Sequence, residues 1–366
     1  VKTLWNKGLL YEGKFVVSYS SALGTTLSNF EASLDYRDIQ DPSLTLKCKL
    51  KGKHAGKNLL VWTTTPWTMP ANLAVAVDPK GIYAEVKDSS GDCFYILKER
   101  ISAYWPKENE VSIERELLGA ELHGCDYEPF FDCWLHKANE HCFKVYGTDY
   151  VLHDTGTGAV HTAPAFGEDD FNAAKKYHLP VLDHLDNAGL YNQGNPPEIV
   201  GLDFKGGDKW LIADLKKRGF VFKHETFVHS YPHCYRSGTP LMYRAVPSWF
   251  VKVEENRDLF LKINDDINWV PDHIKQGRFG KWLENARDWN IGRSRYWGNP
   301  IPIWKNNTTG EELCIGSVGE LERDAGKKIT DLHMEFIDSI LIDSQKFPGT
   351  KLKRVPFVLD CWFESE

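Results

Sequence analysis

Apolar and polar residues alternate along several short stretches of the first 200 residues. The segments 44–52 (LTLKCKLKG), 59–65 (LLVWTTT) and 71–77 (ANLAVAV) either alternate or are rich in β-branched residues, which is typical of strands. Pairs of apolar runs also flank short polar turns at 89–92 (SSGD) and 155–158 (TGTG), and each pair predicts a β-hairpin. We therefore expect the chain up to about residue 200 to be rich in strands.

Helical spacing appears in three later segments. Apolar residues recur every three or four positions over 168–177 and over 208–218, and Gly219 follows as a suitable C-cap. The segment 271–289 has a proline near its start and also predicts a helix. The polar stretch 35–42 is predicted to connect two strands. The pattern therefore predicts a β-rich first part with short helices and an α/β second part.

Breaks in pattern and composition divide the chain. We expect an N-terminal connection over residues 1–14, a β-rich core over 15–200, a helical continuation over 201–230 and an incomplete α/β segment over 231–366. The main boundary is expected near Tyr231, where tyrosine, proline and histidine become frequent. The sequence lacks an initial methionine and ends in a strand-like run, DCWFESE. It is therefore expected to be a piece of a longer protein.

The composition is that of an ordinary globular protein. Acidic residues number 51 and basic residues 44, for a formal net charge of −7, and 42% of the residues are hydrophobic. No apolar run reaches the length of a membrane-spanning helix, and no signal peptide is visible. The eight cysteines are scattered without a C-x-x-C pair, which predicts reduced thiols. We expect a cytoplasmic protein with no membrane partner.

The segment Trp62–Thr68 (WTTTPWT) has the most unusual composition, with four threonines and two tryptophans at the end of a predicted strand. Such a loop can offer hydroxyl and backbone N–H groups to a ribose, ester or phosphate, and its indoles can stack on a base. The alternative is a β-bend in which threonines satisfy the strand end and tryptophans fill the core. The composition alone leaves both interpretations open.

A second segment, Gly156–Asp170, combines a strand, a turn and an acidic helix start. Its GTG lacks the third glycine of a dinucleotide-binding loop and precedes a strand, so a Rossmann phosphate loop is not expected. The order of elements allows His161, on the strand, and Asp170, on the helix, to face one cavity. The alternatives are a histidine satisfied within the core and a carboxylate that only complements the helix dipole.

Charged and metal-ligating residues elsewhere give weaker signals. Five lysines within eleven residues could contact a phosphate backbone, or could protect an exposed edge strand; they are Lys47, Lys49, Lys51, Lys53 and Lys57. His229, His233 and Cys234 lie close in sequence, but no second pair of ligands completes a zinc site. We predict no metal.

Two motifs carry a resemblance to a known family. The segments 62–72 (WTTTPWTMPAN) and 156–171 (GTGAVHTAPAFGEDDF) resemble the threonine-rich loop and the substrate-pocket strand of the editing domain of isoleucyl-tRNA synthetases. Three later segments resemble the region where class I synthetase chains return to the catalytic domain: 231–250, 286–304 and 360–365. The resemblance implies a β-barrel-like class I editing domain of α+β character with flanking α/β segments.

Related families and subtypes differ within these motifs. In valyl- and leucyl-tRNA synthetases the threonine loop continues with Arg-Pro-Glu, whereas this chain has Pro66, Trp67 and Thr68. The sequences of 247–253 and 268–289 favour the cytosolic eukaryotic or archaeal type. Some bacterial relatives have C-x-x-C where this chain has Cys234 and Ser237, so no zinc is expected here.

The resemblance implies hydrolysis of valine from mischarged tRNA(Ile). Isoleucyl-tRNA synthetases are the standard example of a pocket that rejects a substrate one methylene smaller by only ~150-fold, so a second site must remove the error. On this basis the partner is the tRNA(Ile) 3′ end carrying valine, together with the catalytic domain of the same polypeptide. Editing would need no cofactor. ATP and magnesium would serve only the full-length enzyme, because the HIGH-type and KMSKS-type signatures are absent from these 366 residues.

Roles for individual residues follow from the same resemblance. The expected catalytic residues are Thr63, Thr64, Thr65, Thr68 and Asp170, with Asp170 also pairing with the substrate's α-ammonium group. The expected substrate-binding residues are Asn72, Trp67, His161, Thr162 and Ala163, with His161 limiting the side-chain pocket and Trp67 mainly bracing the loop. No Ser-His-Asp or Cys-His arrangement is visible, so we expect direct attack by an oriented water. The alternatives are a non-catalytic tRNA-binding insertion and the editing domain of a valyl or leucyl relative.

Overall fold

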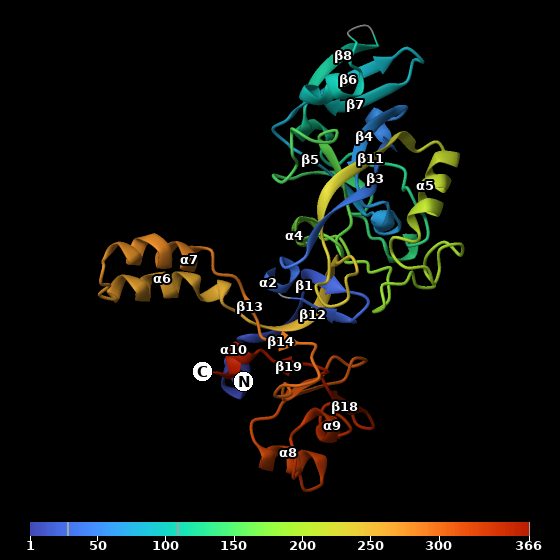
Figure 1. Cartoon of the computed structure of the whole chain (residues 1–366). Coiled ribbons are helices and arrows are strands. Elements are labelled where there is room, and N and C mark those ends of the chain that lie inside the picture. Colours follow the sequence, from blue (N-terminus) through green and yellow to red (C-terminus); the bar gives the residue numbers. More distant parts are fainter. Residues whose placement is uncertain (28, 108–109, 366) are drawn as a thin grey trace. The chain divides into compact units, whose positions relative to one another are not determined.

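In the computed structural model, which describes residues 1–27, 29–107 and 110–365, the alternating segments of the first half form a mixed sheet (Figure 1). Its central path has the order β8-β6-β7-β4-β10-β5-β9, and β3 joins β4 to β11. The strands are β3 (Tyr36–Lys49), β4 (Lys57–Thr63), β5 (Ala74–Val77), β6 (Ile82–Asp88), β7 (Cys93–Leu97), β8 (Val111–Leu118), β9 (Lys144–Gly147), β10 (Ala159–Thr162) and β11 (Val221–Pro232). The sheet curls into a half-barrel, so the expected α+β class with a barrel-like sheet is confirmed.

The chain divides into two units. The large unit comprises Phe15–Val246 and contains the mixed sheet; the small unit comprises Val1–Lys14 and Pro247–Glu366. Strands β1 (Leu10–Ser20) and β12 (Met242–Val251) run across the division. The expected boundary near Tyr231 is therefore misplaced. Tyr231 belongs to β11, which pairs with β3 from Val221 to Pro232, and this pairing keeps the segment in the large unit.

The core of the large unit lies against the sheet. Leu44, Leu46, Leu59 and Val61 are fully buried on paired strands β3 and β4. Burying such side chains stabilises the fold by roughly 1.5–3 kcal/mol each. A second apolar cluster surrounds Trp67. The two clusters fix the end of β4, from which the threonine loop continues.

Helices of the large unit agree with the sequence pattern. The helix α4 (Glu168–Tyr177) and the helix α5 (Asp208–Lys217) begin and end close to the predicted bounds, and Gly219 has the positive φ of +75° expected of a residue after a helix. The remaining elements of this unit are β2 (Thr25–Thr26), α2 (Asn29–Ala32) and α3 (Ile101–Tyr104).

Two sheets lie wholly within the described residues of the small unit, and β13 pairs with β12 in a further sheet. One has the order β16-β15-β18-β17, and the other pairs β14 with β19. Its strands are β13 (Trp289–Asn290), β14 (Gly292–Arg293), β15 (Ile303–Lys305), β16 (Glu312–Cys314), β17 (Leu341–Asp343), β18 (Lys351–Arg354) and β19 (Val358–Leu359). Its helices are α1 (Lys2–Asn6), α6 (Arg257–Asp266), α7 (Gly280–Glu284), α8 (Val318–Ala325), α9 (Met334–Ile337) and α10 (Cys361–Glu364).

Three local predictions differ from the structure. The polar stretch 35–42 is largely strand, because β11 supplies hydrogen-bond partners along it. The hairpin at 155–158 is absent among the described residues, since β10 pairs with β4 and β5 instead. The helix expected over 271–289 is limited to a π-helical turn at Lys275–Phe279 and to α7, because Gly277 is non-helical. The hairpin at 89–92 is confirmed by the antiparallel pairing of β6 with β7.

No helix in the described parts of the chain is long and apolar enough to cross a membrane.

Candidate functional site

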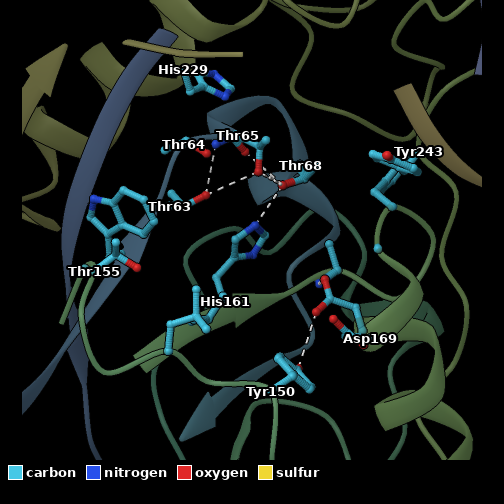
Figure 2. A pocket seen from close by; sticks show the side chains of 18 of the residues that line it. Thr63, Thr64, Thr65, Thr68, Tyr150, Thr155, His161, Asp169, His229 and Tyr243 are labelled. Atoms are coloured by element: carbon cyan, nitrogen blue, oxygen red, sulfur yellow. Dashed lines mark hydrogen bonds between the residues drawn. The ribbon is translucent and has the colours of Figure 1, made fainter. Parts of the chain in front are cut away.

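A cavity of about 580 Å³ lies in the large unit, beside the end of β4 (Figure 2). Its walls come from the threonine loop, defined as residues 62–68, from the segment 155–170, and from residues 229–232 of β11. Tyr36 and Tyr243 also border it. The two sequence motifs therefore line one cavity, as the resemblance implied.

The threonine loop is held by its own hydroxyl groups. The Thr65 N–H donates to Thr63 Oγ1 at 3.1 Å, and the Thr68 hydroxyl donates to the Thr65 carbonyl at 2.8 Å. Pro66 begins the 3₁₀ helix Pro66–Ala71, where its missing N–H costs no bond. Thr63 and Thr68 are buried, so these two residues shape the loop.

Thr64 differs from the other threonines of the loop. Thr63, Thr65 and Thr68 are linked by hydrogen bonds between neighbouring groups. Thr64 borders the cavity, is half-buried, and its hydroxyl has no hydrogen-bond partner among the residues that the structure describes. It is therefore the threonine hydroxyl best placed to bind a ligand.

His161 projects from β10 and connects the two motifs. Its Nε2 lies 2.7 Å from Thr68 Oγ1, and its Nδ1 lies 3.3 Å from the Asn72 amide nitrogen. Because the Thr68 hydroxyl donates elsewhere and an amide nitrogen only donates, Nε2 carries the proton and Nδ1 accepts. Burial lowers the pKa of His161 to about 4, so the ring is neutral at pH 7.

Asn72 lies behind His161 rather than on the cavity wall. Its amide oxygen accepts from the Tyr127 hydroxyl at 2.7 Å, and its amide nitrogen donates to the Ala74 carbonyl at 2.9 Å. Thr162 is also buried and lies outside the cavity lining. Both were predicted to touch the substrate. Their positions instead favour an indirect role, in which Asn72 fixes the His161 ring.

Asp170 lies in the first turn of α4 and borders the same cavity as the threonine loop. One carboxylate oxygen accepts from the Ala163 N–H at 3.0 Å, and the other from the Tyr150 hydroxyl at 3.4 Å. Desolvation raises the pKa of Asp170 to about 6 despite these two donors. No cationic side chain contributes to this pKa, so the carboxylate can still gain a cationic partner.

Ring contacts and main-chain hydrogen bonds hold Trp67 in place. Its indole meets Phe166 and Phe204 edge-on, with ring centroids 5.1 and 5.0 Å away. Its carbonyl accepts from His184 Nε2 at 2.9 Å and from the Tyr191 hydroxyl at 3.2 Å. The Trp67 ring borders the cavity but is 4% exposed. These contacts support the expected bracing role more than direct substrate binding.

Sequence reasoning missed a polar side chain on the cavity wall. His229 of β11 borders the cavity, and its Nε2 lies 3.1 Å from Asp41 Oδ2. Lys205 Nζ donates to both Asp41 oxygens, at 2.7 and 2.8 Å. The sequence suggests His229 only as a metal ligand, and Asp41 lies in the stretch predicted to be a connection. The alternation of histidine with aromatic residues at 227–231 was the available signal.

Three of the five lysines in the lysine run are paired with carboxylates. Lys47, Lys49 and Lys57 pair with Asp92, Glu128 and Glu85 respectively. Within the described residues, no three His, Cys, Asp or Glu side chains converge as a metal site requires. The Cys234 thiol instead hydrogen-bonds with Ser237.

A comparison with protein families identifies the family of this chain. A family model described as tRNA synthetases class I (I, L, M and V) matches residues 1–366. The chain belongs to this family. As a class I synthetase segment, it is also similar to isoleucine–tRNA ligases of *Bdellovibrio bacteriovorus* and *Chlamydia caviae*, at 47% identity in both cases. These matches cover 99% and 100% of this chain and 34% of each relative.

The relatives correct the expected subtype. They are bacterial, and the ligase of *Chlamydia pneumoniae* is a further example at 46% identity over 100% of this chain. The eukaryotic or archaeal type is therefore wrong, because similarity of this extent to bacterial proteins includes the two segments on which that prediction depended. The crystal structure of GlLeuRS-CP1 aligns with 52% of this synthetase segment and 99% of its own chain, at 14% identity and a TM-score of 0.39.

Proposed function

We propose that this chain hydrolyses the ester of valine on tRNA(Ile) and thereby edits the errors of an isoleucine–tRNA ligase. The observation that carries the proposal is the cavity itself, which Asp170, His161 and the threonine loop line together. The names of the relatives support isoleucine as the amino acid of the parent enzyme. The chain spans about a third of their length, so the rest of the enzyme's activity is also part of the proposal.

Asp170 would bind the substrate's α-ammonium group. An aminoacyl ester carries this positive charge next to the bond to be broken, and a desolvated carboxylate is a strong partner for it. The raised pKa of Asp170 means that the free site resists ionisation, and an ammonium group would restore the ionised form. The carboxylate would thus place the ester carbonyl in the cavity.

The threonine loop would hold the other side of the ester. The free Thr64 hydroxyl would bind the ribose, the carbonyl or the attacking water, while Thr63, Thr65 and Thr68 keep the loop in shape. His161, as a neutral ring, would limit the size of the pocket that holds the side chain of the substrate's amino acid. No covalent intermediate is needed, because a positioned water can attack an ester directly.

A non-catalytic tRNA-binding insertion is the main competing function. It would need basic surfaces or aromatic faces but no assembled cavity, and the pairing of Lys47, Lys49 and Lys57 with carboxylates weakens it. The convergence of both motifs on one cavity favours hydrolysis. An editing domain of a valyl or leucyl relative is disfavoured by the isoleucine–tRNA ligases among the relatives.

The proposal extends to cofactors and partners. Editing would proceed without a cofactor, whereas ATP and magnesium would serve aminoacylation by the catalytic domain of the full-length polypeptide. The macromolecular partner would be the 3′ end of tRNA(Ile) carrying valine, in the cytoplasm.

The test is the loss of valine from tRNA(Ile) in the presence of the chain. We expect hydrolysis well above the rate in buffer, and a roughly 10- to 100-fold lower rate for Asp170→Asn, since a hydrogen bond to a charged group contributes about 1.5–3 kcal/mol. Asp169→Asn is the matched control, because this exposed neighbour also borders the cavity. Equal rates for Asp170→Asn and the unaltered chain would refute the proposal.

A further inference from the structure

One polar group on the cavity wall has no part in the mechanism above. The His229 ring contacts two neighbours on β11, Phe227 and Tyr231, at centroid distances of 5.4 and 5.6 Å. Its side chain is 24% exposed and borders the cavity. Asp41, 8% exposed, lies behind it and is held by Lys205. A partly buried ion pair thus supports a histidine that borders the cavity.

The hydrogen bond with Asp41 decides which atom His229 offers to a ligand. A carboxylate held by an ammonium group only accepts, so His229 Nε2 must donate to it. In the neutral ring this leaves Nδ1 as an acceptor, and Nδ1 has no hydrogen-bond partner among the described residues. In this tautomer the histidine recognises a donor, such as a hydroxyl or an amine.

The position of His229 decides which part of the substrate it meets. In Figure 2, His229 is drawn toward the end of the cavity that holds the threonine loop, whereas Tyr150 and Asp169 are drawn toward the other end. Tyr150 is the hydroxyl partner of Asp170, so the amino-acid end of the substrate belongs there. The nucleoside end must then extend toward His229, where the cavity is also bordered by Trp62 and Tyr231.

We infer that His229 accepts a hydrogen bond from the terminal nucleoside of the substrate and helps to select that nucleoside. The inference rests on the proposed hydrolase function and adds a specificity residue to it. The donor is either the exocyclic amine of the base or a free hydroxyl of the ribose. Both are hydrogen-bond donors attached to the same nucleoside.

The experiment pairs substrate changes with a change in His229. Valyl esters of three nucleosides are compared: adenosine, purine riboside, which lacks the amine, and 2′-deoxyadenosine, which lacks the neighbouring hydroxyl. Each rate is corrected for hydrolysis in buffer. For the unaltered chain we expect kcat/KM to fall about 10-fold with one of the two analogues, since one net hydrogen bond contributes roughly that factor.

His229→Phe keeps a ring of similar shape but has no acceptor. We expect this variant to hydrolyse the valyl esters of adenosine and of the sensitive analogue at equal rates. The donor that the analogue lacks has no acceptor in this variant. His229→Asn returns an acceptor close to the Nδ1 position and should recover part of the discrimination. Circular dichroism of both variants checks that β11 is folded.

The outcomes separate this inference from the proposed function. If each analogue lowers kcat/KM of His229→Phe by the same factor as it lowers kcat/KM of the unaltered chain, the nucleoside contact lies elsewhere and the inference is wrong. The same holds if neither analogue slows the unaltered chain. If the unaltered chain hydrolyses no valyl ester at all, the hydrolase function fails and the contact fails with it.

Discussion

At the scale of single residues, burial favours the neutral forms of Asp170 and His161, which both border the cavity. Desolvation raises the pKa of Asp170 to about 6 and lowers the pKa of His161 to about 4. A neutral histidine suits a wall that must exclude a larger aliphatic side chain. A carboxylate that ionises reluctantly responds strongly to a cationic ligand. The cavity is therefore matched to a substrate with one ammonium group and one apolar side chain.

Asp170 predicts a pH profile. Hydrolysis should fall as the pH drops through about 6, because protonation of Asp170 removes the partner of the ammonium group. Stability should change in the opposite direction: the raised pKa contributes stability below the pKa of about 4 in the unfolded chain, and that contribution is lost as the pH rises through about 6. A pH series of kcat/KM and of thermal unfolding, for the unaltered chain and Asp170→Asn, checks both. A variant that keeps the same acid limb would exclude Asp170 as its origin.

His161 predicts a change in amino-acid selectivity. His161→Ala should enlarge the side-chain pocket and raise the rate of isoleucine loss from tRNA(Ile) by about 10-fold or more, since one methylene corresponds to ~1–3 kcal/mol in a fitted pocket. Val160→Ala, on the same strand and bordering the same cavity, controls for general loosening. If isoleucine stays protected in His161→Ala, another side chain excludes it.

The sequence predicted residues of this site unequally. The two motifs identified the threonines, His161 and Asp170 because each motif is continuous in the chain. The pair of His229 with Asp41 depends on the register of two distant strands, β11 and β3, and no local pattern reveals such a register. The sequence also could not show that Thr64 alone keeps a free hydroxyl, since this depends on the turn geometry of the loop.

At the scale of elements, the threonine loop is held through the main chain of Trp67. The Trp67 N–H donates to the Asp208 carboxyl at the start of α5, and its carbonyl is bound by His184 and Tyr191. Asp208 Oδ1 is buried without a partner, and burial raises the pKa of Asp208 to about 7. An element outside both motifs therefore positions the loop.

Two substitutions of Asp208 should separate the effect of its charge on stability from the effect of its hydrogen bond. Asp208→Asn keeps an oxygen for the Trp67 N–H and removes a charge that burial disfavours, so it should unfold at the same or a higher temperature at pH 8. Asp208→Leu leaves that N–H unpaired and should lower the free energy of unfolding by about 1–3 kcal/mol. It should also lower kcat of ester hydrolysis more than it raises KM. Equal stability and kcat for the two variants would show that α5 does not position the loop.

The sequence predicted regular elements better than their connections. The helices α4 and α5 were correct because apolar spacing and end signals agree within one short segment. The hairpin at 155–158 was wrong because β10 found partners in β4 and β5, which are distant in sequence. The same cause hid the first half of β3, whose polar residues pair with β11.

At the scale of the whole molecule, the candidate editing site lies within one unit. The cavity residues fall between Tyr36 and Tyr243, inside the large unit Phe15–Val246. The small unit gathers the first 14 residues with the segment from Pro247 onward. This arrangement supports an insertion whose two ends meet in the rest of the enzyme. Editing and aminoacylation are then expected to be separable activities.

Separability predicts that this chain does not activate amino acids. Isoleucine-dependent exchange of pyrophosphate into ATP should stay at the background level, because the HIGH-type and KMSKS-type sequences are absent from its 366 residues. The assay is run beside ester hydrolysis on the same preparation. Exchange above background would show that the chain contains an ATP site that the sequence does not reveal.

The most direct test of the account compares two esters on one tRNA. The chain is incubated with tRNA(Ile) carrying valine and, separately, with tRNA(Ile) carrying isoleucine, and the loss of each amino acid is followed over time. The cavity, with Asp170 at one end and His161 on its wall, predicts rapid loss of valine and retention of isoleucine. Equal rates for the two esters, or rates no faster than in buffer, would contradict it.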